Sequence, residues 1–389
     1  MVKYISSALI ITLLIGVGTS TYNGEGIAAS AVQFNYVAGL AVDTQNGDVY
    51  VADRNTPRVR VLTRSTGLVY TFAGTGSGSN NGDGGDATSA GITPDPVYLD
   101  SSLGYLYVGD YNNNKVRYVY SVMPTMSPTT LLPTVCPTTA APSAVPTSTR
   151  STMNGIATIM GTGGSSSSGT GGPSESASVK SPHGVWMDSV GVLYVSELDG
   201  NCIRKFALSD HIVVNVVGTC GASGTLTSDG GVASSAGIDR PISLMGDSIG
   251  NLYFAEFGNN MVRYVSSAGT MNTLAGTGTP SNSGDGGPAT SATLSAPVGV
   301  WVSSSGYVYM SLYDGSFVRR VSGGVIALVA GKCLFMTYVA VVVMYIFAVT
   351  GSGTAVNLGG QATSASLSLP ERVCGDTQGL LYISDSGEQ

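Results

Sequence analysis

The sequence has little charge, few histidines and few cysteines, and each shortage excludes a class of protein. Asp, Glu, Lys and Arg make up 11% of the 389 residues, too few for the polar faces of helical bundles or coiled coils. The five cysteines show no C-x-x-C spacing, and two histidines cannot build a His-rich metal site. Zinc-finger and thioredoxin-like proteins are therefore excluded.

The charges that are present are mostly acidic. The formal net charge is −7, so the field of the protein repels phosphate backbones and anionic lipids. We therefore expect no nucleic-acid partner. Membrane contact is expected only if one of two apolar runs, residues 5–17 or 332–349, inserts.

Glycine and tyrosine are abundant instead, with 54 and 20 copies, and 43% of the residues are hydrophobic. This composition is typical of many short strands joined by tight turns. A G-x-x-Y segment, for example GDVYVAD or GYLYVGD, recurs along the chain. Its tyrosines are Tyr50, Tyr107, Tyr194, Tyr253, Tyr309 and Tyr382. The shorter intervals are 56 to 59 residues, and the two longer ones contain inserts, which indicates a repeat of about 57 residues.

Each repeat contains four short segments separated by turns. They are an apolar segment that usually follows a proline, the G-x-x-Y segment, an Arg-bearing segment and a segment ending in A-G-T-G. Four such segments indicate a four-stranded antiparallel sheet, one blade of a β-propeller. Because one sheet cannot bury both of its faces, successive blades must pack around an axis. We predict an all-β, six-bladed propeller that spans residues 1–389 as a single domain.

The sixth blade is predicted to form from both ends of the chain. Residues 1–19 align without a gap with residues 261–279, which carry a third and a fourth strand, and residues 367–389 supply a first and a second strand. This 2+2 closure leaves no unpaired edge in the ring. Lys3 followed by an apolar run through Val17 also has the size of a secretory signal peptide, so a leader is the alternative.

The blocks P-x-G-V, G-x-L-Y, N-x-V-R-Y-V and GDGGPATSA resemble the NHL-repeat family of β-propellers in its long-linker form, over nearly the whole chain. The resemblance implies the propeller fold. The fifth repeat departs from the pattern at Leu312 and Ser316, and the linkers near residues 169 and 358 lack the aspartate. The resemblance therefore implies no uniform loop chemistry.

Two segments interrupt the repeat. Residues 121–152 are rich in Pro and Thr, and we expect a loop between the third and fourth strands of the second blade, with a composition typical of O-glycosylated stalks. Residues 332–349 are apolar and interrupt the fifth blade. The flanking repeat rejoins cleanly without them, and Gly331-Lys332 can be encoded by GGTAAG, which contains an intron donor. We interpret this segment as a retained intron.

Strand counting places the turns between second and third strands and the linkers between repeats on one face, where acidic residues gather. These are Asp53, Asp110, Glu197 and Glu256 in the turns, and Glu25, Asp83, Asp229 and Asp285 in the linkers. Short acids in turns usually accept hydrogen bonds from their own backbone, and calcium binding is the alternative. A basic residue recurs in each third strand and is expected to pair with an acid or a carbonyl. These residues are Lys3, Arg60, Arg117, Arg204, Arg263 and Arg319.

The second residue of each P-x-G block is expected at the mouth of the central channel. Asp95, His183 and Glu371 hold this position in three repeats and can converge as metal ligands or acid–base groups. A hydrogen-bonded structural role is the simpler interpretation of His183. Cys202 and Cys220 flank a predicted strand hairpin, so a disulfide between them is geometrically feasible and would indicate an oxidising compartment.

We therefore predict a non-catalytic, monomeric scaffold that binds a protein, peptide or glycan through one loop-rich acidic face. The alternative is a channel-mouth, metal-dependent hydrolase, lactonase or lyase that uses Asp95, His183 and Glu371. No firm cofactor is expected, and a divalent cation such as calcium is the candidate. The composition favours an extracellular location.

Overall fold

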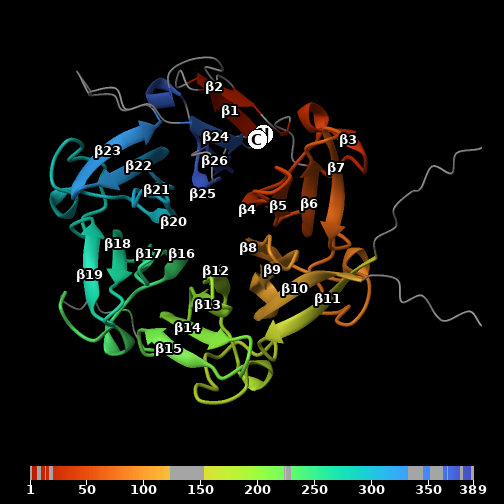
Figure 1. Ribbon diagram of the computed structural model, residues 1–389, viewed down its shortest axis with the longest axis horizontal. Helices are drawn as coiled ribbons and strands as arrows, with labels where there is room; N and C mark the ends of the chain where they lie inside the picture. Colours follow the sequence, from red (N-terminus) through yellow and green to blue (C-terminus); the bar gives the residue numbers. More distant parts are fainter. Residues whose placement is uncertain are drawn as a thin grey trace, which may run out of the picture.

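The chain folds as a ring of β-sheets around a central axis (Figure 1). The computed structural model describes residues 2–6, 10–13, 15–16, 21–122, 153–222, 224, 229–331, 345–350, 362–365, 367–376 and 380–386. Among these residues, five sheets are antiparallel blades, and a further sheet lies between the fifth blade and the first. The prediction of an all-β propeller with four-stranded antiparallel blades is confirmed.

The strands of each blade follow one another along the chain. Blade 1 contains β4 (Val37–Val42), β5 (Val49–Asp53), β6 (Arg58–Thr63) and β7 (Leu68–Ala73), with β3 (Ile27–Ala28) paired to β7. Blade 2 contains β8 (Pro94–Asp100), β9 (Tyr105–Asp110), β10 (Lys115–Val122) and β11 (Met153–Met160). Blade 3 contains β12 (Pro182–Met187), β13 (Val192–Glu197), β14 (Cys202–Ala207) and β15 (Val214–Val217). Blade 4 contains β16 (Pro241–Gly246), β17 (Leu252–Glu256), β18 (Met261–Val265) and β19 (Met271–Ala275). Blade 5 contains β20 (Pro297–Val302), β21 (Val308–Leu312), β22 (Phe317–Ser322) and β23 (Val325–Ala330).

The first strand of each blade lies next to the axis, and the fourth strand lies at the perimeter (Figure 1). β4, β8, β12, β16, β20 and β25 (Pro370–Gly375) contact one another in ring order. The hydrophobic core lies between neighbouring sheets, since each main cluster combines residues of two of them. Ala52 and Val59 of blade 1, for example, share a cluster with Leu106 and Val108 of blade 2. This packing explains why the blades are stable only as a ring.

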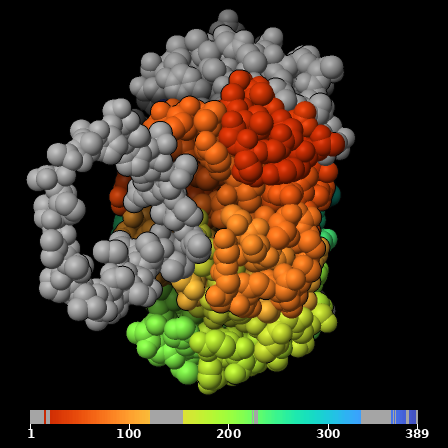
Figure 2. Space-filling model, turned by 90° about the vertical axis from the view of Figure 1, so that its right-hand side faces the viewer, coloured from red at the N-terminus to blue at the C-terminus, as the bar shows by residue number. Residues whose placement is uncertain are grey.

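The linkers between blades cover the outer edges of the sheets. Short 3-10 helices follow the Gly-rich turns of the linkers, and they are η2 (Ala87–Ser89), η4 (Ser174–Ser176), η5 (Ala233–Ser235), η6 (Ala289–Ser291) and η7 (Ala362–Ser364); a further one, η1 (Ala29–Ala31), follows β3. In the linkers into blades 2 to 5, the residue before the 3-10 helix forms a β-bridge with the next blade, at its fourth strand or at a residue beside that strand. Asp86 bridges Gly155 of blade 2 in this way, and Pro288 bridges Val325 of blade 5. Figure 2 shows the outer side of blades 1 and 2, where linkers and strands form one continuous surface. Covered edges do not offer a template for strand addition.

One linker glycine shows why the turn sequence is needed. Gly284 has φ +94°, and a Cβ atom there would lie 2.8 Å from Cα of Ala292 in the same linker. Only glycine fits this close approach of two linker segments.

The sheet between blades 5 and 1, here named the closing sheet, differs from the prediction. Its order is β1 (Val2–Ser6), β2 (Ile10–Leu13), β24 (Tyr345–Thr350), β26 (Leu380–Asp385) and β25. Strands from both ends of the chain do share this sheet, but β24 lies between them and pairs in parallel with β26. The predicted direct pairing of residues 1–19 with β26 is therefore wrong.

The physical reason lies in the composition of β24. Its sequence YIFAVT is rich in aromatic and β-branched residues, which favour strands, and an unpaired edge of β26 accepts any extended segment in reach. β24 contains the end of the apolar segment 332–349, of which residues 332–344 lie outside the described residues, as do residues 123–152 of the Pro/Thr-rich segment. Within the described chain, no helix is long and apolar enough to cross a membrane.

Candidate functional site

The two faces of the ring carry different loops. The linker face is defined by the linkers that lead into the first strands and by the turns between second and third strands. The hairpin face is defined by the turns between first and second strands and between third and fourth strands. The inner strands all run from the linker face to the hairpin face, because each linker enters a first strand.

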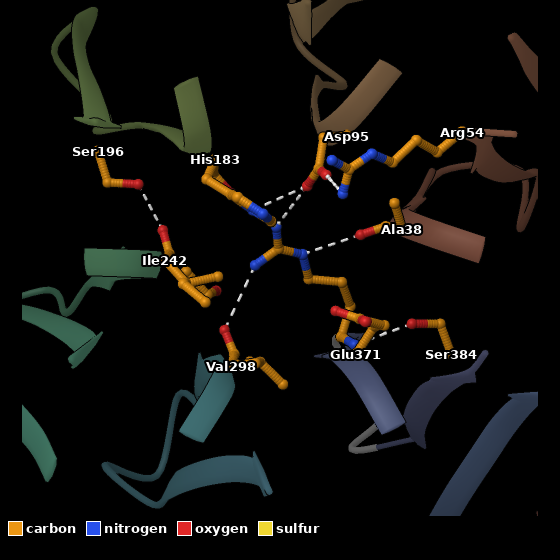
Figure 3. Close-up of polar contacts among 12 residues, drawn as sticks. Ala38, Arg54, Asp95, His183, Ser196, Ile242, Val298, Glu371 and Ser384 are labelled. Carbon is orange, nitrogen blue, oxygen red and sulfur yellow. Dashed lines mark hydrogen bonds and ion pairs between the residues drawn. The ribbon is translucent and has the colours of Figure 1, made fainter. Parts of the chain in front are cut away.

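Asp95 and His183 meet at the linker-face end of the channel. Each is the second residue of an inner strand, in β8 and β12, and Nδ1 of His183 lies 2.9 Å from Oδ1 of Asp95. Glu371 holds the same position in β25, but its carboxylate accepts a hydrogen bond from the hydroxyl of Tyr36. Figure 3 shows Asp95, His183 and Glu371 around the axis. The structure therefore brings Asp95 and His183 into direct contact and gives Glu371 a different partner.

Sequence reasoning missed Arg372, which joins the groups at the channel mouth. Its Nη2 atom lies 3.0 Å from Oδ1 of Asp95 and donates to the carbonyl oxygen of His183 at 2.6 Å. Its Nε donates to the carbonyl of Ala38 at 3.0 Å and its Nη1 to the carbonyl of Val298 at 3.4 Å. One guanidinium thus ties the closing sheet to blades 1, 2, 3 and 5.

A signal for Arg372 is present in the sequence. The third residue of the P-x-G block is Gly, Pro or Ser in the other repeats, at Gly39, Pro96, Gly184, Ser243 and Gly299. Arg372 is the one charged residue at this position, directly at the axis of the expected ring.

The charges at the mouth compensate one another. Burial acts to raise the pKa of Asp95, but His183, Arg372 and Arg54 together lower it. Nη1 of Arg54 lies 2.8 Å from Oδ2 of Asp95, so both carboxylate oxygens are engaged. Burial raises the pKa of Glu371, although the hydrogen bond from Tyr36 and the charge of Arg372 oppose this.

This donor set fits a guanidinium better than a divalent ion. Both oxygens of Asp95 already contact arginines, and Nη2 of Arg372 lies between Asp95 and His183, where a shared metal would have to be bound. A cation and a guanidinium would compete for the same oxygen atoms.

The acids of the second-to-third turns are buried and do not form a charged surface. Asp53, Asp110, Glu197 and Glu256 have exposed fractions of 0%. Their oxygens accept hydrogen bonds from nearby backbone, as Asp110 does from N of Thr93 at 2.7 Å. The expectation of an acidic linker face is therefore wrong for these four residues.

The third-strand arginines are also structural, as predicted. Arg117 lies 2.8 Å from Asp83 of the linker and donates to two linker carbonyls. Arg263 pairs with Asp229 at 3.0 Å and Arg319 with Asp285 at 2.8 Å. Arg60 donates to the carbonyl of Gly24, and Arg204 pairs with Glu197. The side chain of Lys3 lies outside the described residues.

Cys202 and Cys220 form a disulfide with 5.0 Å between their Cα atoms. Glu197 lies close to both sulfur atoms, which makes these three residues a group that could hold a metal ion in the reduced state. However, Glu197 already contacts Arg204 and Ser167. The disulfide therefore links the start of β14 to the segment after β15.

The hairpin face differs in character from the linker face. Five of the six inner strands are followed on the hairpin face by an aspartate at the start of the first-to-second turn. The five aspartates are Asp43, Asp100, Asp188, Asp247 and Asp376. All five are half-buried. At the turn tips of three adjacent blades, Leu103, Val190 and Ile249 are 55%, 82% and 73% exposed. Sequence reasoning missed this combination of acidic and apolar residues.

A cavity of about 180 Å³ lies in the channel on the hairpin side of Arg372. It is lined by all six inner strands, and the larger side chains among the lining residues are Leu40, Tyr98, Leu99, Trp186, Met245 and Trp301. Among its twenty lining residues, Arg372 alone is charged. The channel therefore consists of a charged plug at the linker face and, below it, a cavity whose wall is partly polar and partly apolar.

These observations define a β-propeller with a plugged channel, and comparison with known proteins agrees with this class. A family model of the NHL repeat matches residues 34–62, which cover most of β4 to β6. This match and the propeller fold of the chain support the NHL-repeat family of β-propellers, which its repeated blocks predict. A search of curated protein sequences gives no match.

Several solved structures share the fold at low sequence identity. A protein of unknown function from Bacteroides thetaiotaomicron VPI-5482 is 15% identical, with a TM-score of 0.60, and the match covers 100% of this chain and 74% of that chain. An auxiliary nutrient binding protein from the same organism is 11% identical, with a TM-score of 0.61 and the same coverage. A streptogramin B lyase is 12% identical, with a TM-score of 0.50 and coverage of 94% of both chains. At these identities the likeness concerns the fold alone.

Proposed function

We propose that this protein is a non-catalytic propeller that binds a protein or peptide partner through its hairpin face. The observation that carries the proposal is the exposure of Leu103, Val190 and Ile249 on three adjacent blades of one face. Exposed apolar side chains on the loops of a rigid scaffold are typical of protein interaction sites. The aspartates beside them favour a partner with basic residues.

The fold itself does not favour binding over catalysis, because both a nutrient binding protein and a lyase share it. The channel mouth supports the binding proposal, since Arg372 engages the oxygens that a catalytic metal would need. Metal analysis of the purified protein tests the alternative. A stoichiometric ion that is lost in His183→Ala would favour the metal-dependent hydrolase, lactonase or lyase.

The binding proposal is tested by crosslinking capture with the purified chain. A variant with Leu103→Ser, Val190→Ser and Ile249→Ser is expected to lose the partner that the unchanged protein captures. Val232→Ser is the matched control, because Val232 is 67% exposed but lies in a linker at the perimeter. Equal capture of the same partner by all three proteins would contradict the proposal.

We further propose that the ring has six blades, with strands of both termini in the sixth, and that the protein is a monomer in an oxidising, extracellular compartment. The shared sheet of β1, β2, β25 and β26 supports the first part. The disulfide of Cys202 and Cys220 supports the compartment, since such bonds persist outside the cytosol. Non-reducing peptide mapping of protein from its source tests the disulfide and with it the compartment. The mass of the protein in solution tests the monomeric state.

A further inference from the structure

Five tyrosines lie side by side in blade 2, where this blade packs against blade 3. They come from β8, β9 and β10, and we name them the tyrosine panel: Tyr98, Tyr105, Tyr107, Tyr118 and Tyr120. Neighbouring ring centroids are 5.3 to 6.4 Å apart. Tyr107 is 1% exposed, and the other four are half-buried. The panel is therefore one continuous aromatic cluster that reaches the surface.

The panel also carries hydroxyl groups that the described part of the chain leaves without a hydrogen bond. Tyr98 donates to the carbonyl of Met187 in blade 3 at 3.0 Å, but the hydroxyls of the other four tyrosines bond no described residue. Burial and the nearby charge of Asp100 raise the pKa of Tyr107, so its hydroxyl stays protonated and is able to donate and accept. A buried hydroxyl without a partner costs free energy that a ligand recovers.

The panel contains no charged side chain, unlike the equivalent positions in two other blades. The third-strand residue opposite the G-x-x-Y tyrosine is Lys205 in blade 3 and Arg320 in blade 5, where the panel has a tyrosine. Blade 4 also pairs two tyrosines, Tyr253 and Tyr264, but the hydroxyl of Tyr253 donates to Asp247 at 3.1 Å. Blade 2 thus differs from these blades in combining uncharged rings with several unpaired hydroxyls.

A glycine positions the outermost ring of the panel. β10 and β11 have eight residues each, whereas the third and fourth strands of the other antiparallel blades have four to six. Tyr120 lies opposite Gly155 in this longer pair. A Cβ atom on Gly155 would lie 2.5 Å from Cζ of Tyr120, so the phenol end of the ring lies directly against the backbone of β11.

We infer that the tyrosine panel binds a neutral sugar of a glycan. A sugar ring presents C–H groups that pack on aromatic rings, and its hydroxyls donate and accept as the unpaired tyrosine hydroxyls do. The absence of charged side chains from the panel favours a neutral ligand, and Asp100 near Tyr107 disfavours an anionic one. The inference goes beyond the proposed protein partner and does not need the exposed turn tips.

Calorimetric titration of the full chain tests the inference. The probes are the neutral sugars cellotetraose, maltotetraose and xylotetraose, and tetragalacturonate is the anionic control. Decaproline is a further control, because proline-rich peptides also pack on aromatic side chains. At least one neutral sugar is expected to bind saturably, whereas the anionic sugar is expected not to bind.

Tyr107→Phe together with Tyr118→Phe removes two hydroxyls and keeps both rings. Because neither hydroxyl bonds a described residue, the thermal midpoint is expected to stay unchanged. Sugar affinity is expected to fall about tenfold, since two hydrogen bonds to the ligand are lost. Tyr70→Phe is the matched control, because Tyr70 is 40% exposed in β7 of blade 1, outside the panel.

Gly155→Ala keeps every tyrosine but displaces the ring of Tyr120, and alanine fits the extended backbone of β11. Sugar affinity is expected to fall about fivefold, because one packed ring is lost from the site. The inference is overturned if no neutral sugar gives a saturable isotherm or if tetragalacturonate or decaproline binds more tightly than every neutral sugar. Unchanged sugar affinity in the double phenylalanine variant would overturn it as well. Loss of sugar binding with intact capture of a protein partner would show that the two proposals concern separate sites.

Discussion

At the scale of single residues, Arg372 has the largest influence on the channel. Its side chain is 8% exposed and that of Asp95 is 0% exposed, so their ion pair lies in a region of low dielectric. Removing one member of such a pair leaves a buried charge without its partner, which costs more than the pair contributes. Arg372 also satisfies three backbone carbonyls of different blades. Arg372 therefore fills the linker-face end of the channel and links the closing sheet to the other blades.

Arg372→Met is therefore expected to lower the free energy of unfolding by about 3 kcal/mol. Asp95 then retains only Arg54 and His183. Asp95→Asn is expected to cost less in this variant than in the unchanged protein, because its ion pair with Arg372 is already absent. Urea unfolding of the two single variants and the double variant measures the coupling. Strictly additive losses would show that the pair does not interact.

A second prediction at this scale concerns pH. Burial raises the pKa of Asp53 to about 7, although hydrogen bonds from Thr56 and N of Asn35 oppose this. The unfolded carboxyl titrates near about 3.9, so the folded state binds the proton more tightly. The contribution of Asp53 to stability is thus complete below about pH 4 and is lost as the pH rises towards 7.

Asp53→Asn is expected to flatten the fall in unfolding free energy between these pH values. Urea unfolding at pH 4, 5, 6 and 7 measures the slope. At pH 4 the variant and the unchanged protein should be almost equally stable, which serves as the internal control. An unchanged slope would show that Asp53 is ionised in the fold throughout this range.

At the scale of elements, the linkers act as additional short strands. The linkers into blades 2 to 5 each bridge the fourth strand of the following blade or a residue beside it. A buried arginine of the third strand contacts each of these linkers. In blade 4, Asp229 pairs with Arg263 and accepts from N and Oγ1 of Thr273 at 2.9 and 3.0 Å. Glu25 makes the corresponding contacts with Thr71 in blade 1. The acids of the GDGG blocks therefore attach the linker to the blade.

Asp229→Ala is expected to destabilise the protein by about 1 to 2 kcal/mol, because the buried guanidinium of Arg263 loses a charged partner. The effect should be local, with faster amide hydrogen exchange in η5 and β19 than elsewhere. Ser234→Ala in the same linker is the control, since Ser234 is exposed. Uniformly faster exchange in all blades would contradict a local role for the linker.

At the scale of the whole molecule, the closing sheet decides whether the ring is sealed. Leu381 and Ile383 of β26 pack against Tyr309 and Val318 of blade 5, while Tyr382 packs against blade 1. The closing sheet thus contacts both neighbours through alternate residues of one strand. The place beside β26 is filled by β24, which pairs with it along its whole length.

Deletion of residues 332–349 is expected to preserve the fold, with a thermal midpoint within a few degrees of the full chain. Residues 1–19 are then free to pair with β26 in the antiparallel arrangement of the other blades. Scanning calorimetry and hydrogen exchange of the β26 amides check this. Deletion of residues 380–389 is the control and should unfold the ring, since it removes the packing on both neighbours. Unfolding of the first variant would show that β24 is essential.

The sequence by itself determined the repeat, the four strands of each blade and the resemblance to NHL repeats. These follow from local patterns, because alternating apolar residues, turn glycines and recurring blocks are legible without tertiary contacts. It also placed Asp95 and His183 at one mouth, since equivalent positions in a ring must converge.

Only the tertiary structure decided the partner of each charge and of each strand edge. Whether Asp110 is exposed or buried depends on the linker that covers it. Whether β1 or β24 lies next to β26 depends on pairing between segments that are far apart in the sequence. Arg372 could be seen as an exception in the repeat, but not as the plug of the channel. Its role arises because four blades bring carbonyl and carboxylate oxygens to the axis beside it, and such convergence exists only once the ring has formed.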